Sequence, residues 1–270
     1  MVTMSRPKKW TARKIAALKG KEKIAAITAY DYATARFVDA SGMHLVLVGD
    51  SLGMTMLGYQ STLPVTVDEM IHHTAAVVRG TENALVVGDM PFMSYQPGID
   101  LTMINAGRFL QEAGADAVKI EGGQERVELV EALVKAAIPV MGHIGLTPQS
   151  IKDFGGFKVQ GRTNEEAERL VADAKALEQA GVFAIVLEAI PPALAQRITD
   201  SLSIPTVGIG AGPNCDGQIL VINDLLGMYD EFTPKFVKQY AQLGEEMKRA
   251  FAEYIRDVQD GTFPSNEHCY

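Results

Sequence analysis

Cysteine is scarce in this chain, which has only Cys215 and Cys269 among its 270 residues. The two stand far apart, and neither has the close spacing to other ligands that is typical of zinc sites. A scaffold held together by disulfides is therefore excluded, because such scaffolds are rich in cysteine for their length. We expect the protein to work in a reducing compartment, the cytoplasm.

Long apolar runs and an excess of basic charge are also absent. No segment approaches the ~18 consecutive apolar residues that indicate a membrane span, and no apolar run follows the first basic residues as in a signal peptide. The formal net charge is −8, and no basic stripe offsets it. We therefore expect neither a membrane nor a nucleic acid as a partner. Hydrophobic residues make up 47% of the chain, enough for a large buried core.

Eight short apolar segments recur along the chain, separated by longer amphipathic ones. Most are rich in Val, Ile or Leu, as is typical of parallel strands buried on both faces. They are Ile24–Ala29, His44–Val48, Ala84–Val87, Ala117–Ile120, Ile138–Met141, Ala184–Leu187, Thr206–Ile209 and Gln218–Ile222. The alternation predicts an α/β fold. We favour a (β/α)8 TIM barrel over a doubly wound sheet, because no glycine-rich nucleotide loop follows the first predicted strand.

Helix boundaries are marked by capping residues and glycines. The expected N-caps are Thr66 and Thr163, each followed three residues later by Glu, together with Asp31 and Asp100; the expected terminal glycines are Gly42, Gly114 and Gly181. An extra N-terminal helix over Thr11–Leu18 is expected to plug the barrel floor, and a helical segment over Pro234–Asp257 closes the series. No long linker divides the chain, so we predict a single domain over residues 1–270, with residues 1–9 as a flexible arm.

Charged residues gather where the predicted strands end, at the rim that carries function in such barrels. They are Asp50, Asp89, Glu121 and Glu188, with Lys119 beside Glu121. Ordinary ion pairing with Lys119 would explain one or two acids and leave the others repelling one another. A divalent cation resolves this repulsion, and the lack of a His/Cys cluster indicates Mg²⁺ rather than Zn²⁺. We predict that Asp50, Asp89 and Glu121 form a metal site.

Two further roles follow from position. Lys119 and Glu121 alternate along one strand and so share a face. Lys119 can bind a substrate carboxylate or stabilise an enolate; a Schiff-base role is the alternative, which neighbouring acids disfavour by keeping the amine charged. Glu188 suits a general base, and its alternative is a metal ligand or the partner of one. His143 is either a substrate contact or a structural residue.

Longer motifs surround these residues and resemble the ketopantoate hydroxymethyltransferase family. The matching segments are 48–54 (VGDSLGM), 89–95 (DMPFMSY), 118–123 (VKIEGG), 142–150 (GHIGLTPQS), 154–162 (FGGFKVQGR), 208–212 (GIGAG) and 215–218 (CDGQ). The resemblance extends from Trp10 to the end of the chain. A metal-dependent aldolase or lyase acting on another 2-oxo acid would fit the rim residues equally well, and the long motifs favour this family over it. A non-catalytic barrel that binds a ligand would not need a base such as Glu188.

The resemblance implies a reaction and a set of roles. A hydroxymethyl group is transferred from 5,10-methylenetetrahydrofolate to 3-methyl-2-oxobutanoate, giving 2-dehydropantoate for pantothenate and coenzyme A biosynthesis. The implied metal positions for one Mg²⁺ per subunit are Asp50, Asp89 and Glu121; the implied keto-acid positions are Asp50, Ser51, Asp89 and Lys119; the implied proton acceptor is Glu188. Because Mg²⁺ usually retains several waters, Glu121 could act directly or through water. The family forms homo-oligomers, commonly decamers.

Overall fold

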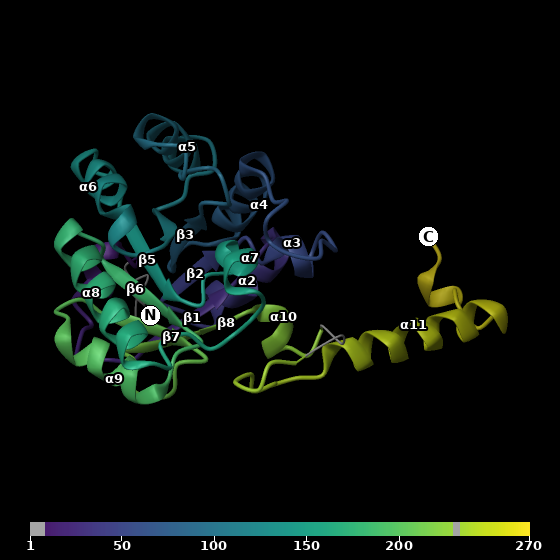
Figure 1. Cartoon of the computed structure of the whole chain (residues 1–270). Helices are drawn as coiled ribbons and strands as arrows, with labels where there is room; N and C mark the ends of the chain where they lie inside the picture. Colours follow the sequence, from purple (N-terminus) through teal and green to yellow (C-terminus); the bar gives the residue numbers. More distant parts are fainter. Residues whose placement is uncertain (1–8, 229–232) are drawn as a thin grey trace, which may run out of the picture. The chain divides into compact units, whose positions relative to one another are not determined.

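In the computed structural model, residues 9–228 and 233–270 are described, and their eight strands close a parallel barrel in sequence order (Figure 1). The strands are β1 (Ile24–Thr28), β2 (Leu45–Val48), β3 (Leu85–Asp89), β4 (Ala117–Glu121), β5 (Val140–Gly145), β6 (Ala184–Glu188), β7 (Thr206–Ile209) and β8 (Gly217–Leu220). Every residue of β2, β3, β4 and β5 is buried, as the apolar runs predicted. The predicted (β/α)8 barrel is confirmed.

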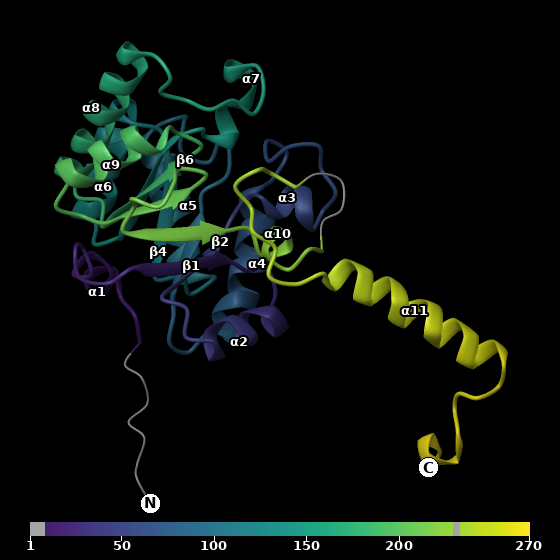
Figure 2. The same cartoon turned by 90° about the horizontal axis from the view of Figure 1, so that it is seen from below.

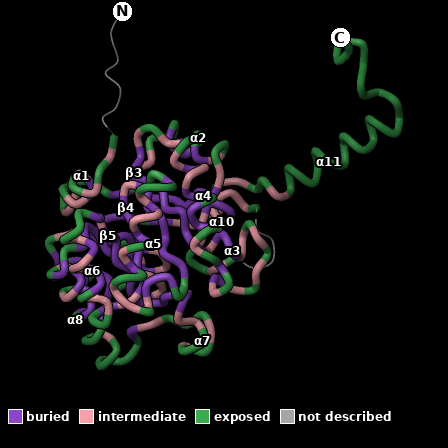
Figure 3. Tube along the Cα trace, turned by 90° about the horizontal axis from the view of Figure 1, so that it is seen from above, coloured by how far each residue is buried: buried purple, intermediate pink, exposed green. Residues whose placement is uncertain are grey.

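The helices alternate with these strands. They are α1 (Ala12–Ala16), α2 (Tyr32–Ala40), α3 (Leu52–Thr55), α4 (Val67–Gly80), α5 (Ile99–Gln111), α6 (Val127–Lys135), α7 (Ile151–Phe154), α8 (Asn164–Ala180), α9 (Pro192–Ser201), α10 (Ile222–Leu225) and α11 (Leu243–Gln259). Short 3-10 helices are η1 (Gln124–Arg126), η2 (Pro148–Ser150) and η3 (Asn266–His268). Figure 3 shows the strands as the buried centre of the barrel.

Most of the predicted helix boundaries are confirmed. Both Thr–Glu capping boxes are present, and Asp31 accepts a hydrogen bond from the Thr34 amide at 2.9 Å. Gly181 ends α8 with a φ of 100°, the left-handed conformation expected there. The Asp100 cap is wrong: the N-cap of α5 is Gly98, two residues earlier, and Asp100 lies in the first turn of the helix. A carboxylate in the first turn still stabilises the helix through its interaction with the helix dipole.

The N-terminal helix fills the floor of the barrel, as predicted. Ile15 of α1 is fully buried in the same core cluster as side chains from the strands, including Ile24 and Leu45. Figure 2 shows α1 beside the start of β1. Residues 1–8 of the predicted arm lie outside the described residues, and Lys9 forms an ion pair with Asp116 at 2.8 Å.

The chain divides into two compact units, one extending to Val221 with the whole barrel, and the other from Ile222 to Tyr270. The helix predicted over Pro234–Asp257 begins only at Leu243, because the residues before it turn back on the preceding loop. The Tyr240 amide donates to the Leu225 carbonyl at 2.8 Å. The single domain stays a prediction. No helix among the described residues is long and apolar enough to cross a membrane.

Candidate active site

The ends of five neighbouring strands, β2 to β6, bring the predicted site residues together at one mouth of the barrel. In register, Asp89 lies beside Lys119, and Glu121 beside His143. Five of these side chains are almost completely buried, with the whole residue 2–4% exposed: Asp50, Asp89, Lys119, Glu121 and His143. Because burying a bare charge is costly, this cluster must balance its own charges.

Lys119 lies at the centre of the cluster. Its Nζ is 3.0 Å from Asp89 Oδ1 and 3.6 Å from Glu121 Oε1, and 3.0 Å from His143 Nδ1. Burial alone would lower the pKa of Lys119, but Asp89, Glu121 and Asp50 outweigh it and raise that pKa above the usual value. The amine therefore stays protonated, which disfavours the Schiff-base alternative.

Three buried carboxyl groups, those of Asp50, Asp89 and Glu121, surround the single ammonium group of Lys119. Burial, followed by repulsion from Asp89 and Glu121, raises the pKa of Asp50 well above its usual value. Burial also raises the pKa of Asp89, despite the nearby Lys119. Burial opposes the ionisation of Glu121, but Lys119 and His143 outweigh it and lower the pKa of Glu121. In the absence of a further cation, burial and repulsion thus disfavour the ionised forms of Asp50 and Asp89.

These acids fit a divalent cation in their chemistry, since carboxylate oxygens are typical Mg²⁺ ligands. Asp50 and Asp89 adjoin one another, since the Asp50 amide donates to Asp89 Oδ2 at 3.1 Å. The buried oxygens Asp89 Oδ1 and Glu121 Oε1 lie 3.0 and 3.6 Å from Lys119 Nζ. Within the described ranges, no three His, Cys, Asp or Glu side chains converge closely enough to enclose a metal. Lys119 thus lies between Glu121 and the adjoining pair of Asp50 and Asp89.

Glu188 is the most accessible acid of the site. Its side chain is 17% exposed, and its Oε2 lies 3.2 Å from His143 Nε2. Burial and Lys119 lower the pKa of His143, but Glu121 and Glu188 raise it further, to about 9. His143 thus lies between two carboxylates, with Nδ1 3.4 Å from Glu121 Oε1 and Nε2 3.2 Å from Glu188 Oε2. Glu188 accordingly lies beside a polar ring rather than in an apolar pocket.

The backbone around Glu188 is tightly constrained. The Glu188 carbonyl accepts from the Leu146 amide at 2.9 Å. A Cβ on Gly145, whose φ is 96°, would lie 2.3 Å from that carbonyl oxygen, so only glycine fits there. Ala189 has a φ of 46°, a conformation that costs non-glycine residues energy and is often found at functional sites. These constraints fix the direction of the Glu188 side chain.

Ser51 extends the site toward β1. It is half-buried, and its Oγ lies 2.9 Å from the hydroxyl of Tyr30. A Cβ on Gly49 would lie 2.8 Å from Ser51 Oγ, so the missing side chain makes room for this hydroxyl. Ser51 is thus placed beside Asp50 with a hydroxyl that can donate or accept.

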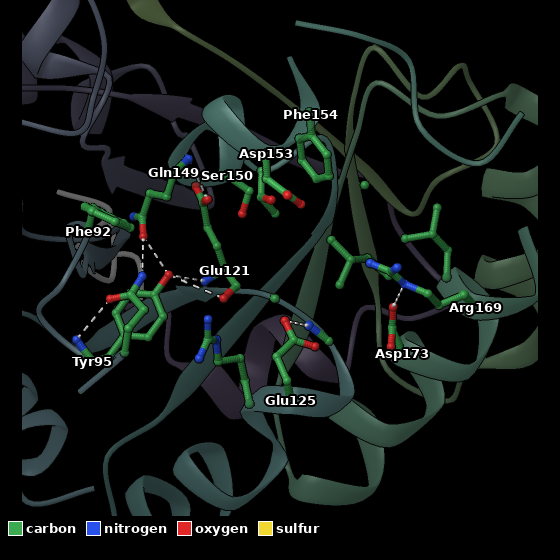
Figure 4. A pocket seen from close by; sticks show the side chains of 18 residues that line it. Phe92, Tyr95, Glu121, Glu125, Gln149, Ser150, Asp153, Phe154, Arg169 and Asp173 are labelled. Atoms are coloured by element: carbon green, nitrogen blue, oxygen red, sulfur yellow. Dashed lines mark hydrogen bonds and ion pairs between the residues drawn. The ribbon is translucent and has the colours of Figure 1, made fainter. Parts of the chain in front are cut away.

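A cavity of about 210 Å³ adjoins the ends of β4 and β5 (Figure 4). Its lining includes two polar residues that the sequence reasoning missed, Tyr95 and Gln149. Both are buried, and the Tyr95 hydroxyl donates to Gln149 Oε1 at 2.6 Å. Both residues lie within the motifs shared with the family, so the motifs could have indicated them. A search for charged residues at strand ends does not find them, because both are neutral.

The closed parallel barrel, with charged side chains at the carboxyl ends of its strands, defines a (β/α)8-barrel enzyme. Solved barrels share the fold. A 2,3-dimethylmalate lyase of the PEP mutase/isocitrate lyase superfamily superposes with a TM-score of 0.63 at 17% identity, covering 98% of this chain and 93% of that one. An oxaloacetate acetylhydrolase gives 0.59 at 13% identity, with 96% and 90% covered. At these identities the likeness shows the fold alone.

The chain belongs to the ketopantoate hydroxymethyltransferase family, whose sequence model matches residues 9–266. The 3-methyl-2-oxobutanoate hydroxymethyltransferase of Syntrophus aciditrophicus (strain SB) is 57% identical over 271 residues, covering 100% of both chains. The protein of the same name from Clostridium novyi (strain NT) is 60% identical over 249 residues, covering 92% of this chain and 90% of that one. The resemblance in the motifs is confirmed, and the chain is a transferase rather than an aldolase or lyase.

Proposed function

We propose that this enzyme transfers a hydroxymethyl group from 5,10-methylenetetrahydrofolate to 3-methyl-2-oxobutanoate, forming 2-dehydropantoate for pantothenate and coenzyme A biosynthesis. The observation that carries the proposal is the full-length family match, together with a carboxylate, Glu188, held beside the buried Lys119 cluster. The reaction needs a base and a cation at one carbon acid, and these residues supply both.

Mg²⁺ would be held by Asp50 and Asp89, with Glu121 as a ligand directly or through water. When bound, it supplies Lewis-acid polarisation of the 2-oxo acid. Glu188 then removes the C3 proton of the keto acid, because it is the acid of the cluster with access to the mouth. Lys119 stabilises the negative charge of the resulting enolate, since its ammonium group stays protonated. The enolate carbon forms a bond to the methylene carbon of the folate; both C–N bonds to that carbon break, tetrahydrofolate leaves, and water supplies the hydroxyl oxygen of the product.

The keto acid would be bound by Asp50, Ser51, Asp89 and Lys119. Ser51 Oγ and Lys119 Nζ supply hydrogen-bond donors for its carboxylate and keto oxygen. Asp50 and Asp89 repel a bare carboxylate, so they contact the keto acid through the cation they hold. The substrate is thus placed between the acids of β2 and β3 and the base on β6.

The proposal is tested by product formation. The chain, Mg²⁺, 3-methyl-2-oxobutanoate and methylenetetrahydrofolate are expected to give 2-dehydropantoate, detected by mass spectrometry, and EDTA is expected to abolish it. A parallel assay replaces the folate with free aldehydes. Product formed only from aldehydes, or turnover unaffected by EDTA, would contradict the proposed donor or the proposed metal.

We also propose that the protein is a cytoplasmic homo-oligomer, a decamer. An exposed apolar face on α11 supports the assembly. Six apolar side chains lie along one side of this helix and are 36–59% exposed: Leu243, Met247, Phe251, Tyr254, Ile255 and Val258. Such a stripe is typical of a face that packs against another surface. The other residues of α11 are polar or small, and no residue of α11 is buried. Both cysteines are free, which suits a reducing compartment.

Changing Phe251 to Asp is expected to convert the oligomer into smaller species, because a charge at the centre of the apolar stripe opposes its burial. Sedimentation velocity measures the change. Ala252→Asp, which introduces the same residue on another face of α11, is the matched control. An unchanged assembly in Phe251→Asp, or a wild-type chain that sediments as a monomer, would refute this proposal.

A further inference from the structure

Gln149 is an uncharged residue that contacts two acids of the cluster, Asp50 through its side chain and Glu121 through its backbone amide. It lies in η2, directly after β5, and is 5% exposed. Its Nε2 donates to Asp50 Oδ2 and to the Met90 carbonyl, both at 2.9 Å. Its backbone amide donates to Glu121 Oε2 at 3.1 Å. One residue therefore holds two of the three acids assigned to the metal.

The orientation of the Gln149 amide is fixed by its partners. The Met90 carbonyl can only accept, so the atom facing it must be the NH₂ group. On the other side, Oε1 accepts from the Tyr95 hydroxyl at 2.6 Å and from Gln96 Nε2 at 3.3 Å. The Tyr95 hydroxyl accepts from the Glu121 amide at 3.3 Å and also lies 3.3 Å from the Glu121 carbonyl, so Gln149 Oε1, at 2.6 Å, is the nearer acceptor for its proton (Figure 4). The amide therefore has one satisfied arrangement, with NH₂ toward Asp50.

A neutral donor has a specific consequence at this position. Asp50 is buried and adjoins Asp89, so a neutral partner can orient its carboxylate without neutralising it. A second lysine would replace the metal, and a carboxylate would add to the repulsion. The Gln149 side chain donates to one oxygen of Asp50 and adds no charge of its own. The backbone amide does the same for Glu121 Oε2, while the other oxygen of Glu121, Oε1, lies beside Lys119 and His143.

We infer that Gln149 is a positioning residue that aims the carboxylates of Asp50 and Glu121 for the divalent cation. The inference rests on the proposed function, since it gives Gln149 a role in a metal site that the proposal requires. Partners of this kind hold ligands in the binding geometry before the metal arrives, and their loss typically weakens metal binding about 10- to 100-fold.

The test is the affinity of the intact chain for Mg²⁺ alone, measured by calorimetry without substrate. Gln149→Met keeps the length of the side chain and the backbone amide, and removes the donor to Asp50 and the Met90 carbonyl together with the acceptor for Tyr95 and Gln96. We expect its Kd for Mg²⁺ to rise about tenfold or more. Gln96→Met is the matched control, because Gln96 is half-buried and reaches the cluster only through Gln149; its Kd should stay within about twofold of the wild type.

A second variant keeps the inference testable if Gln149→Met does not fold. Tyr95→Phe removes a single oxygen that orients the Gln149 amide, and it should raise the Kd several-fold. In the double variant the two effects should combine to less than their product, because Tyr95 acts on Asp50 through Gln149.

The outcomes separate the two claims. A wild-type chain that does not bind Mg²⁺ contradicts the proposed metal and with it the inference. A wild type that binds Mg²⁺, with an unchanged Kd in Gln149→Met or fully independent effects of the two substitutions, overturns the inference and leaves the proposed function standing.

Discussion

Replacing Glu188 by Gln is expected to lower kcat about a thousandfold and to stop deuterium exchange at C3 of 3-methyl-2-oxobutanoate, in line with the 10²- to 10⁴-fold contribution of a positioned base. The amide has nearly the shape of the carboxylate, and its oxygen can still accept from His143, 3.2 Å away. The change therefore removes proton affinity and leaves the position of the side chain intact. Proton NMR in D₂O with Mg²⁺ and no folate measures the exchange.

Glu125→Gln is the matched control for this variant. Glu125 is an exposed glutamate of η1, which follows β4, and its carboxylate accepts a hydrogen bond from the Gly123 amide at 3.1 Å. Its exchange rate should equal that of the wild type. Normal exchange in Glu188→Gln would remove Glu188 from the role of base, whatever the overall turnover.

Lys119→Met is expected to reduce kcat about 10²- to 10³-fold, as for the loss of one group that stabilises a forming anion. It should also destabilise the fold by about 3–5 kcal/mol, the cost of removing one partner from a buried ion pair. The reason is that Asp89 and Glu121 lose the ammonium group beside them while they stay buried. Turnover and urea unfolding measure the two effects separately.

The destabilisation by Lys119→Met has a predictable pH dependence. Burial and mutual repulsion already raise the pKa of Asp50 and Asp89 in the folded chain, and loss of the ammonium group raises these values further. The folded state then binds more protons than the unfolded state, so stability should increase as the pH falls from about 7 toward about 4. Lys135→Met, at a largely exposed pair with Glu131, should change neither stability nor turnover. Wild-type stability in Lys119→Met would contradict the central position of this lysine.

The barrel and most of its rim could be predicted because both depend on local patterns. Strands buried on two faces must be apolar throughout, and their ends must then carry the polar residues, which located Asp50, Asp89 and Glu121. The alternation of side chains also placed Lys119 and Glu121 on one face, and their charged atoms lie 3.6 Å apart. No such rule fixes the distances between strands, so the sequence did not show that Lys119 separates Asp89 from Glu121.

Other features depend on loops and on pairing between distant residues. Gln149 lies 99 residues from Asp50 in the chain, and a neutral amide after a strand has no charge that would indicate its partner. The left-handed backbone of Ala189 depends on surrounding hydrogen bonds, since alanine does not favour that conformation by itself. The late start of α11 was missed because backbone hydrogen bonds to residues 225–227 compete with the helix.

The most direct test of the account is a crystal structure of the enzyme with Mg²⁺ and 3-methyl-2-oxobutanoate. We predict Mg²⁺ bound to carboxylate oxygens of Asp50 and Asp89 at about 2.0–2.1 Å, Lys119 beside the keto acid, and a Glu188 oxygen facing the C3 proton. Mg²⁺ bound by Glu188 instead of by Asp50 and Asp89 would contradict the division of these acids into metal ligands and base. So would a keto acid whose C3 faces away from Glu188.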